Sequence, residues 1–204
     1  MELKLGIINY NAGNIFSVSS AFRHLGLHPH LVTKPDELNS LTHLILPGVG
    51  SYAHCYDKLK SAGLVGKIRE WVLEKKKPLL GICVGMQLLS DYGEEMGGSE
   101  GLGLIRGVVR RMPKVEDFRI PHVGWNEISL REDEYFSAGQ LNGDYYFDHS
   151  FSFCPASATN ILATVHHGVE IVAAVKSGNL VGTQFHPEKS QSKGLNLLRT
   201  FVRL

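Results

Sequence analysis

The chain has 204 residues, of which 43% are hydrophobic and 20% charged, and its formal net charge is +1. This composition suits one domain whose core needs no disulfide or metal, and the near-neutral charge excludes an electrostatic footprint for nucleic acid or anionic lipid. With no signal-peptide pattern and no apolar run of membrane-spanning length, the expected location is the cytoplasm.

The first half of the chain alternates short β-rich runs with helical patterns, which indicates βαβ units around a largely parallel sheet. The patterns predict strands over residues 4–9, 30–33, 41–47 and 78–83, and helices over 14–26, 35–41, 62–77 and 84–92. Each predicted strand is followed by a predicted helix or turn, as the connections of a parallel sheet require.

The second half of the chain is richer in strands, separated by Gly, Asn and Asp turns. Strands are predicted over residues 102–112, 123–130, 144–153, 161–167, 169–178 and 180–187, and a helix over 192–204. The predicted fold is α/β: one open, twisted, mixed and largely parallel sheet with helices on both faces, flavodoxin-like, with an antiparallel extension. No linker or repeat divides the chain, so residues 1–204 are expected to form a single domain.

Cys83 lies between two glycines in GICVG, where a predicted strand turns into a helix. This pattern is typical of a nucleophile elbow, in which small neighbours relieve crowding at a strained turn and expose the thiol at the carboxyl edge of the sheet. A buried, inert thiol is the alternative. Cys55 and Cys154 have no such frame and are interpreted as structural, and three cysteines in a reducing compartment argue against a disulfide framework.

Two further motifs supply what a thiol nucleophile needs. In TQFHPEKS, His186 and Glu188 are two apart on a segment expected to be extended, so one side of the chain offers a base and a carboxylate that orients it. In LPGVGSY, the glycines around Val49 allow a post-strand turn that aims N–H groups into a cavity, as an oxyanion hole requires. Ordinary strand-end and turn roles are the alternatives for both motifs.

Together, LPGVG, GICVGMQLL and QFHPEKSQ resemble the triad (class I) glutamine amidotransferases in order and spacing. Further segments, NYNAGN, PHVGWNEI and YYFDHSF, are similar to the glutaminase subunits of imidazole glycerol phosphate synthases. The likeness spans nearly the whole chain. It implies a class I amidotransferase fold.

The resemblance implies a role for each matched residue. Cys83 attacks the side-chain amide of glutamine and forms a thioester, His186 passes a proton to the leaving ammonia, and Glu188 orients His186. Backbone N–H groups of Val49 or Gly50, with that of Val84, stabilise the oxyanion. Residues implied to bind the substrate glutamine are Gln87, Glu95, His149 and Ser150. No cofactor and no metal is implied.

The resemblance also implies a partner, because free ammonia in water would be protonated and lost. This is a (β/α)₈-barrel cyclase subunit, expected to form a heterodimer with the chain, which makes imidazole glycerol phosphate and AICAR in histidine biosynthesis. Asn11, Asn14 and Trp125 match positions at the interface with it, although a buried core role is the alternative for Trp125. Glutamine hydrolysis by the isolated chain is expected to be slow.

Several alternatives remain open from the sequence. Asp148 and Phe151 depart from the common YFVHSY pattern, placing a carboxylate in a slot expected to be apolar, and these departures are compatible with a paralogue that supplies ammonia to another acceptor, such as a surface-polysaccharide sugar. Other readings are a cysteine hydrolase or peptidase on a similar fold, and a scaffold subunit with a decayed site. A metal site is the weakest alternative, because His28 and His30, or His166 and His167, lack ligands at zinc spacing.

Overall fold

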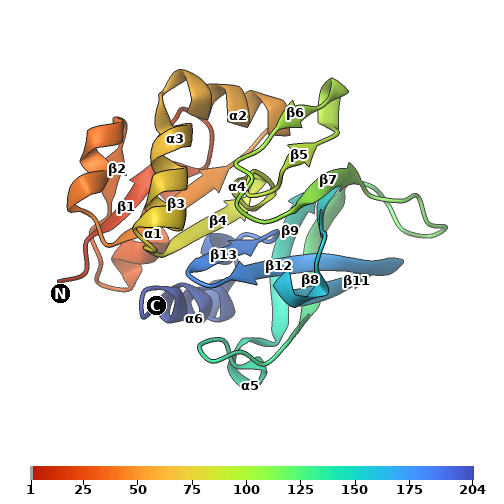
Figure 1. Ribbon diagram of the computed structural model, residues 1–204. Helices are drawn as coiled ribbons and strands as arrows, with labels where there is room; N and C mark the ends of the chain where they lie inside the picture. The colour runs from red at the N-terminus through yellow and green to blue at the C-terminus, as the bar shows by residue number, and fades with distance from the viewer. Residues whose placement is uncertain (1) are drawn as a thin grey trace.

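A nine-stranded mixed sheet forms the centre of the molecule in the computed structural model, which describes residues 2–204 (Figure 1). In spatial order its strands are β2 (His30–Val32), β1 (Leu5–Ile8), β3 (His43–Gly48), β4 (Leu79–Cys83), β13 (Leu180–Thr183), β12 (Val169–Ser177), β11 (Ile161–His167), β8 (His122–Leu130) and β9 (Gly143–His149). The predicted α/β class with an antiparallel extension is confirmed.

Strands β2, β1, β3, β4 and β13 run parallel to one another. The remaining neighbouring pairs, β13–β12, β12–β11, β11–β8 and β8–β9, are antiparallel. Every residue of β3 and β4 is buried, as expected for parallel strands covered on both faces. Strand β13 comes from the end of the chain but inserts beside β4, pairing Thr183 with Ile82. This pairing brings the C-terminal motif next to the glycine-framed cysteine.

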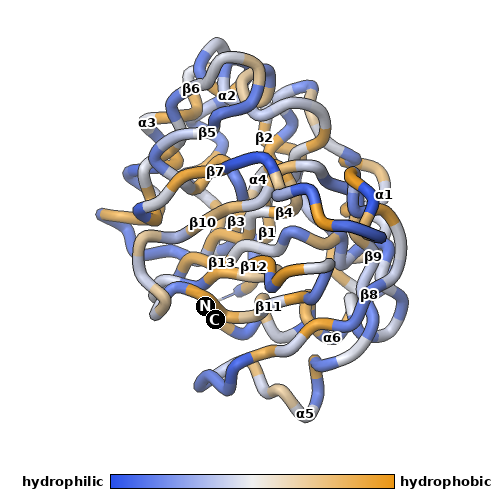
Figure 2. The backbone as a smooth tube through the Cα atoms, turned by 90° about the vertical axis from the view of Figure 1, so that its right-hand side faces the viewer, coloured by the Kyte–Doolittle hydropathy of each residue, from blue (hydrophilic) through white to orange (hydrophobic). Residues whose placement is uncertain are grey.

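Helices cover both faces of the parallel part of the sheet (Figure 1). α1 (Ile15–His24) contacts α6 (Gln191–Phe201), whereas α2 (Tyr52–Ser61) contacts α3 (Leu64–Arg69), which continues as a π-helical turn over Glu70–Glu74. In the tube coloured by hydropathy, the hydrophobic colour follows central strands such as β12 and β13, while most rim loops are hydrophilic (Figure 2). The core therefore lies between the helical layers and the sheet.

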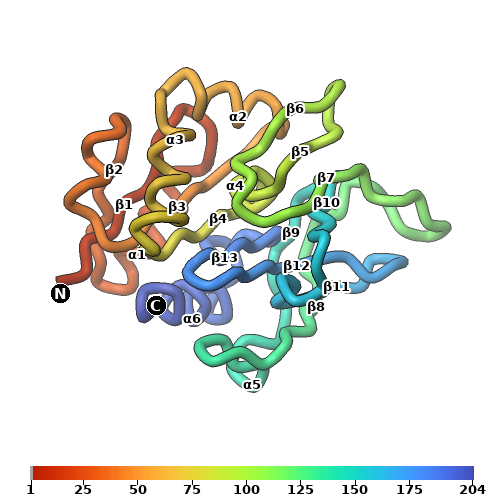
Figure 3. Tube along the Cα trace, in the orientation of Figure 1, coloured from red at the N-terminus to blue at the C-terminus, as the bar shows by residue number. Residues whose placement is uncertain are grey.

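The prediction of a single sheet is wrong. A second sheet has the order β10 (Phe151–Pro155), β7 (Gly107–Arg111), β5 (Tyr92–Gly93) and β6 (Ser99–Glu100), and lies beside the large sheet (Figure 3). The single strand predicted over 144–153 is two strands. β9 pairs with β8 up to His149, and β10 pairs with β7 from Phe151 onward. Ser150 is therefore the junction between the sheets.

Two helix predictions also differ from the structure. The helix predicted over 62–77 begins at Leu64, after Gly63 at φ 69°, and the helix α2 before it was missed. The helix predicted over 84–92 is a single turn, α4 (Val84–Gln87), because backbone N–H groups of residues 102–105 occupy the carbonyls of residues 88–90 that would continue it. A separate short helix, α5, spans Ala138–Leu141.

Short 3₁₀ segments complete the structure, at Pro35–Ser40, Glu95–Gly97, Ala158–Asn160 and Pro187–Lys189. Within residues 2–204, none of the helices has both the length and the apolar character needed to cross a bilayer.

Candidate active site

Cys83 ends the central strand β4 in a backbone conformation that L-residues rarely adopt, with φ 55° and ψ −113°. The turn is held by close packing of glycines. A Cβ atom on Gly81 would lie 2.6 Å from the Gly85 carbonyl oxygen, and one on Gly85 would collide with the Leu46 carbonyl of β3. The elbow predicted from GICVG is therefore present, and its small residues are required by contacts with β3 as well as by the turn itself.

Replacing Gly85 with alanine is expected to lower the free energy of unfolding by about 3 kcal/mol, the upper end for overpacking, because the added methyl group meets backbone that cannot move aside. Gly66→Ala is the matched control. Gly66 lies in α3 with open space around it, so alanine there is expected to raise stability by about 0.5–1 kcal/mol. Urea unfolding of both variants measures the difference, and equal effects would contradict the crowded elbow.

His186 lies between a carboxylate and a thiol. Its Nδ1 is 2.8 Å from Glu188 Oε1, and the Cys83 side chain lies close enough to the imidazole to raise its pKa. The side chains of His186 and Glu188 are only 4% and 1% exposed. Glu188 is not on an extended segment, as the sequence predicted, but in the 3₁₀ turn Pro187–Lys189, which folds its carboxylate back onto the ring. The structure thus brings the three predicted catalytic residues together.

Burial alone would lower the pKa of His186, but hydrogen bonds and charge interactions with Cys83 and Glu188 outweigh it and raise the pKa to about 10. A pKa raised above that of the unfolded chain contributes stability that is complete below the ordinary histidine pKa of 6.5 and is lost as the pH rises through about 10.

The imidazole of His186 is therefore expected to stay protonated at neutral pH and to titrate only in alkaline solution. In Cys83→Ala, which removes one source of the raised pKa, the titration should move to lower pH. Nitrogen-15 NMR of the histidine rings measures both. A His186 signal that titrates near pH 6.5 in the unaltered chain would contradict this ion-pair geometry.

A pocket of about 330 Å³ opens over Cys83 at the carboxyl edge of the sheet. It is lined by nine of the residues predicted to act in catalysis or substrate binding: Val49, Gly50, Cys83, Val84, Gln87, Glu95, His149, Ser150 and His186. Cys83 is 4% exposed yet faces this pocket, so the alternative of a sealed, inert thiol does not hold for it.

The segment predicted as the oxyanion hole forms one wall of the pocket. Gly50 has φ 97° with open space beside it, and Val49 is 40% exposed. Cys55, interpreted from the sequence as structural, is buried in α2 and donates its thiol proton to the Val49 carbonyl at 3.3 Å. Burial raises the pKa of Cys55 to about 11, so this second thiol stays protonated at neutral pH.

Glu95 and Gln87 both line the pocket and are anchored to different elements. Glu95 accepts the backbone N–H of Tyr52 at 2.7 Å through Oε2, which fixes its carboxylate at the start of α2 and leaves Oε1 for a ligand. Gln87 is buried, and its amide nitrogen donates to the Phe151 carbonyl and to Gln184 Oε1, both at 3.0 Å. Only its carbonyl oxygen is therefore left for a substrate.

His149 lines the pocket, but both of its ring nitrogens already have partners. Nδ1 is 2.9 Å from the Phe151 carbonyl, and Nε2 is 3.0 Å from Nδ1 of His122. Burial lowers the pKa of His149 to about 4 and that of His122 to about 3, so both rings are neutral. A polar contact between His149 and a ligand would therefore involve its backbone.

The residues predicted at a partner interface have mixed surroundings. Trp125 is 49% exposed, so the core alternative is wrong for it, and its ring meets Tyr146 edge to face at 6.2 Å. Asn11 is exposed, at φ 59°. Asn14 caps α1 by accepting the Ser17 N–H at 3.1 Å, a local role that the sequence analysis did not assign. The interface itself stays a prediction.

Two residues of the C-terminal motif near the thiol were missed: Lys189, which lines the pocket, and Gln184, which lies behind it in contact with the Cys83 sulfur. Gln184 is fully buried and its amide nitrogen is 3.8 Å from the Cys83 sulfur. The signal was available, because Gln184 is two residues before His186 in the strand predicted over 180–187, where alternation puts both side chains on one side, although β13 itself ends at Thr183.

The sequence predicted an apolar slot for Asp148, and this prediction is wrong. Asp148 is exposed on β9, opposite Val123, and its backbone carbonyl is 4.0 Å from the Cys83 sulfur. Because water can reach its carboxylate, Asp148 needs no buried partner for its charge. Phe151, the second departure, is half-buried and contributes its backbone carbonyl to Gln87 and His149.

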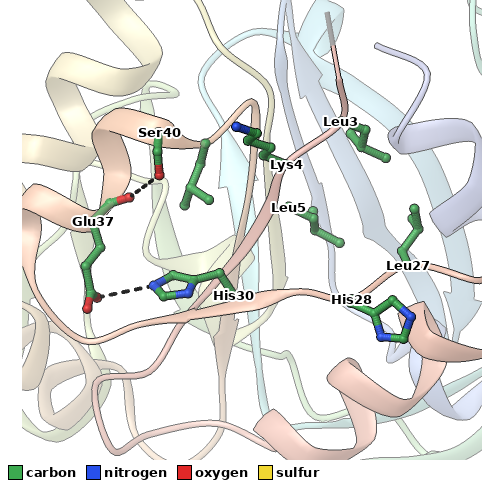
Figure 4. Close-up of a pocket in the computed structure, with 9 residues that line it drawn as sticks. Leu3, Lys4, Leu5, Leu27, His28, His30, Glu37 and Ser40 are labelled. Atoms are coloured by element: carbon green, nitrogen blue, oxygen red, sulfur yellow. Dashed lines mark hydrogen bonds and ion pairs between the residues drawn. The ribbon is translucent and has the colours of Figure 1, made fainter.

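A larger pocket of about 440 Å³ lies at the opposite, amino edge of the strands, where the sticks of His28, His30 and Glu37 border it (Figure 4). His30 Nε2 is 3.8 Å from Glu37 Oε2. His166 and His167 lie elsewhere, on β11, where both rings meet Phe118 edge to face. None of these histidines joins a group of three metal-ligating side chains within residues 2–204.

Comparison with known proteins agrees with this geometry. The model of the family "Glutamine amidotransferase class-I" matches residues 7–204. A solved structure titled "Crystal structure of glutamine amidotransferase" superposes with a TM-score of 0.78 over 98% of this chain and 97% of its own, at 21% identity, which shows the shared fold.

Curated relatives are closer in sequence. The "Imidazole glycerol phosphate synthase subunit HisH" of Zymomonas mobilis is 44% identical, over 97% of this chain and 94% of its own. "HisH 2" of Vibrio vulnificus is 43% identical, over 98% of this chain and 94% of its own. The chain therefore belongs to the class I glutamine amidotransferases and, within them, to the HisH subunits.

Proposed function

We propose that the chain is the glutaminase subunit of imidazole glycerol phosphate synthase, acting as one domain. It hydrolyses glutamine to glutamate and ammonia. The observation that carries this proposal is the buried Cys83–His186–Glu188 arrangement: His186 Nδ1 is 2.8 Å from Glu188 Oε1, and the Cys83 thiol, which lines the pocket, lies close enough to the ring to raise its pKa.

The geometry gives each group a step in the reaction. The Cys83 sulfur attacks the amide carbon of glutamine, and the oxyanion forms against the N–H groups of Gly50 or Val49 and Val84, a stabilisation of about 3 kcal/mol per donor. The protonated His186 gives its proton to the leaving amine, and ammonia departs. Neutral His186 then takes a proton from the attacking water, the C–S bond breaks and glutamate leaves, which restores the Cys83 thiolate and the protonated His186.

The pocket supports glutamine as the substrate over a peptide or a general acyl substrate. Glu95 offers one free carboxylate oxygen, which suits the α-ammonium group of a free amino acid, and Gln87 offers a carbonyl acceptor. A decayed scaffold would have no reason to keep a strained Cys83 and a buried ion pair. The hydrolase and scaffold alternatives are therefore not favoured, and the HisH relatives do not favour the paralogue.

Glu95→Gln is expected to raise KM for glutamine about tenfold or more while leaving kcat within about threefold, because it removes a charged partner of the substrate far from the reacting bond. Steady-state glutamate production measures both constants. The control is Glu94→Gln, since the adjacent Glu94 pairs with Arg110 at an exposed position. A fall in kcat with unchanged KM would contradict the binding role of Glu95.

The partner is proposed to be a (β/α)₈-barrel cyclase subunit that docks over the pocket, through a face that includes Asn11, Asn14 and Trp125, and receives ammonia without release to water. Trp125 supports this face, because an exposed indole is a frequent anchor in protein interfaces. Turnover of the isolated chain is expected to be low and to rise by orders of magnitude with the ligand-bound partner. Equal turnover with and without it would refute this coupling.

Complementation tests the pathway directly. A histidine auxotroph that lacks its glutaminase subunit should grow without histidine when it expresses this chain, and should not grow with the Cys83→Ala variant. Failure of the unaltered chain, together with glutaminase activity beside a different acceptor enzyme, would assign it to another amidation.

A further inference from the structure

We propose that Gln184 is an amide donor to the Cys83 thiolate, held in that orientation by a chain of hydrogen bonds that ends on the Phe151 carbonyl. This deepens the proposed function, on which it rests. The distances along the chain are 3.8 Å from Gln184 Nε2 to Cys83 Sγ, 3.0 Å from Gln87 Nε2 to Gln184 Oε1, and 3.0 Å from Gln87 Nε2 to the Phe151 oxygen.

The direction of the chain follows from the chemistry of its last group. A backbone carbonyl can only accept, so the group of Gln87 that faces Phe151 must be its NH₂. The second hydrogen of that NH₂ is donated to Gln184, so the group of Gln184 that faces Gln87 must be its carbonyl oxygen. The remaining NH₂ of Gln184 is then turned toward the sulfur.

The Phe151 carbonyl is fixed from a second side. His149 Nδ1 is 2.9 Å from the same oxygen, and its Nε2 is 3.0 Å from Nδ1 of His122. Nε2 of His122 is in turn 3.2 Å from the Asn126 amide nitrogen. Because that amide donates, each neutral ring accepts at one nitrogen and donates at the other, which makes the Phe151 oxygen an acceptor from two buried side chains.

Burial makes this arrangement rigid. Gln184 is fully buried, and Gln87 and His149 are 3% and 6% exposed. The backbone N–H of Gln184 is also bonded, to the Ala173 carbonyl of β12 at 2.8 Å. A donor fixed in this way favours the anionic sulfur over the neutral thiol, because a thiol in the same place would receive a weaker hydrogen bond.

The sulfur therefore has two side-chain neighbours that can donate and one backbone acceptor. His186 and Gln184 are the side-chain partners, and the Asp148 carbonyl, at 4.0 Å, can accept from the thiol. Unlike His186, Gln184 has no proton to give away, so it stays a donor throughout the cycle. It would stabilise the thiolate before attack and again when the thioester is cleaved.

Replacing Gln184 with methionine tests the proposal, because it keeps the length of the side chain and removes the donor. We expect the pH of half-maximal alkylation of Cys83 by iodoacetamide to rise by about one unit, and kcat to fall about tenfold with KM for glutamine within about twofold. Gln184→Glu, which turns a carboxylate toward the sulfur, should shift the alkylation profile further. Alkylation is followed on the Cys83 peptide by mass spectrometry, because Cys154 is exposed and would react as well.

These variants keep the other titratable groups near the sulfur, which are His186, His149, Glu95, Asp148 and Lys189 in the pocket lining, and Cys55 and Tyr10, whose pKa values the Cys83 charge raises. Gln140→Met, at an exposed position, is the control and should change neither profile nor kcat. Alkylation profiles of Gln184→Met and Gln184→Glu that match the unaltered chain would overturn the proposal.

A measurement on the unaltered chain does not depend on how the variants fold. The side-chain amide resonances of Gln184 should move over the pH range in which Cys83 becomes alkylated, and this movement should be lost in Cys83→Ala. Resonances that stay constant would overturn the proposal. Neither the alkylation profile nor the amide resonances depend on glutamine turnover. A failure of these two measurements is therefore distinct from a failure of the proposed glutaminase activity.

Discussion

Cys83→Ala is expected to lower glutamine-dependent ammonia release by a factor on the order of 10⁴ or more, because the variant has no atom that can form the thioester. Substrate binding should persist, since Glu95 and Gln87 are held by contacts that do not involve the sulfur. Glutamate production by the full complex, with and without the acceptor, measures the loss.

Two controls separate lost chemistry from lost structure. Cys154→Ala removes an exposed thiol of β10 and should leave the rate unchanged. In the complex, Cys83→Ala should still support product formation when ammonium is added in place of glutamine. Residual glutamine hydrolysis within about tenfold of the unaltered chain would refute the assignment of Cys83 as nucleophile.

Glu188→Gln is expected to lower kcat by a factor on the order of 10³, because a neutral amide cannot stabilise the imidazolium and no longer fixes which ring nitrogen carries the proton. The structure adds a reason for a large effect. Oε2 of Glu188 is buried and has no hydrogen-bond partner among residues 2–204, so an amide NH₂ placed there would also be left unsatisfied.

The control for Glu188→Gln is Glu170→Gln, which changes an exposed carboxylate on β12 and should leave kcat unaltered. In Glu188→Gln the pKa of His186 should fall, because one of the groups that raise it is gone. Activity that survives Glu188→Gln, with an unchanged His186 titration, would show that the carboxylate does not act on the ring.

The alternating pattern of the first half of the chain was sufficient to predict β1 to β4, because buried parallel strands are short apolar runs with clear turn signals. The small sheet could not be predicted, because β5 and β6 are two residues each and carry no periodicity. The length of α4 also depends on residues 102–105, which are distant in sequence and take its carbonyl partners.

The site was more predictable than the small second sheet, because its residues lie in short sequence motifs whose chemistry can be recognised locally. The sequence placed Cys83 at a turn and paired His186 with Glu188, although through the wrong local conformation. What it could not supply was the side-chain partners: that Cys55 holds the Val49 carbonyl, or that both His149 nitrogens are occupied. These depend on packing between elements far apart in the chain.

The place of β13 between β4 and β12 has a consequence for biosynthesis. Gln184 follows Cys83 by 101 residues, so a ribosome adding about 5–20 residues per second needs roughly 5 to 20 s to deliver the strand that completes the centre of the sheet. During that interval the nascent chain carries an apolar strand edge on β4 and a reactive sulfur without its imidazole. A chaperone that shields this edge would raise the yield of folded protein, and no ammonia can be released from glutamine before the ribosome has added His186.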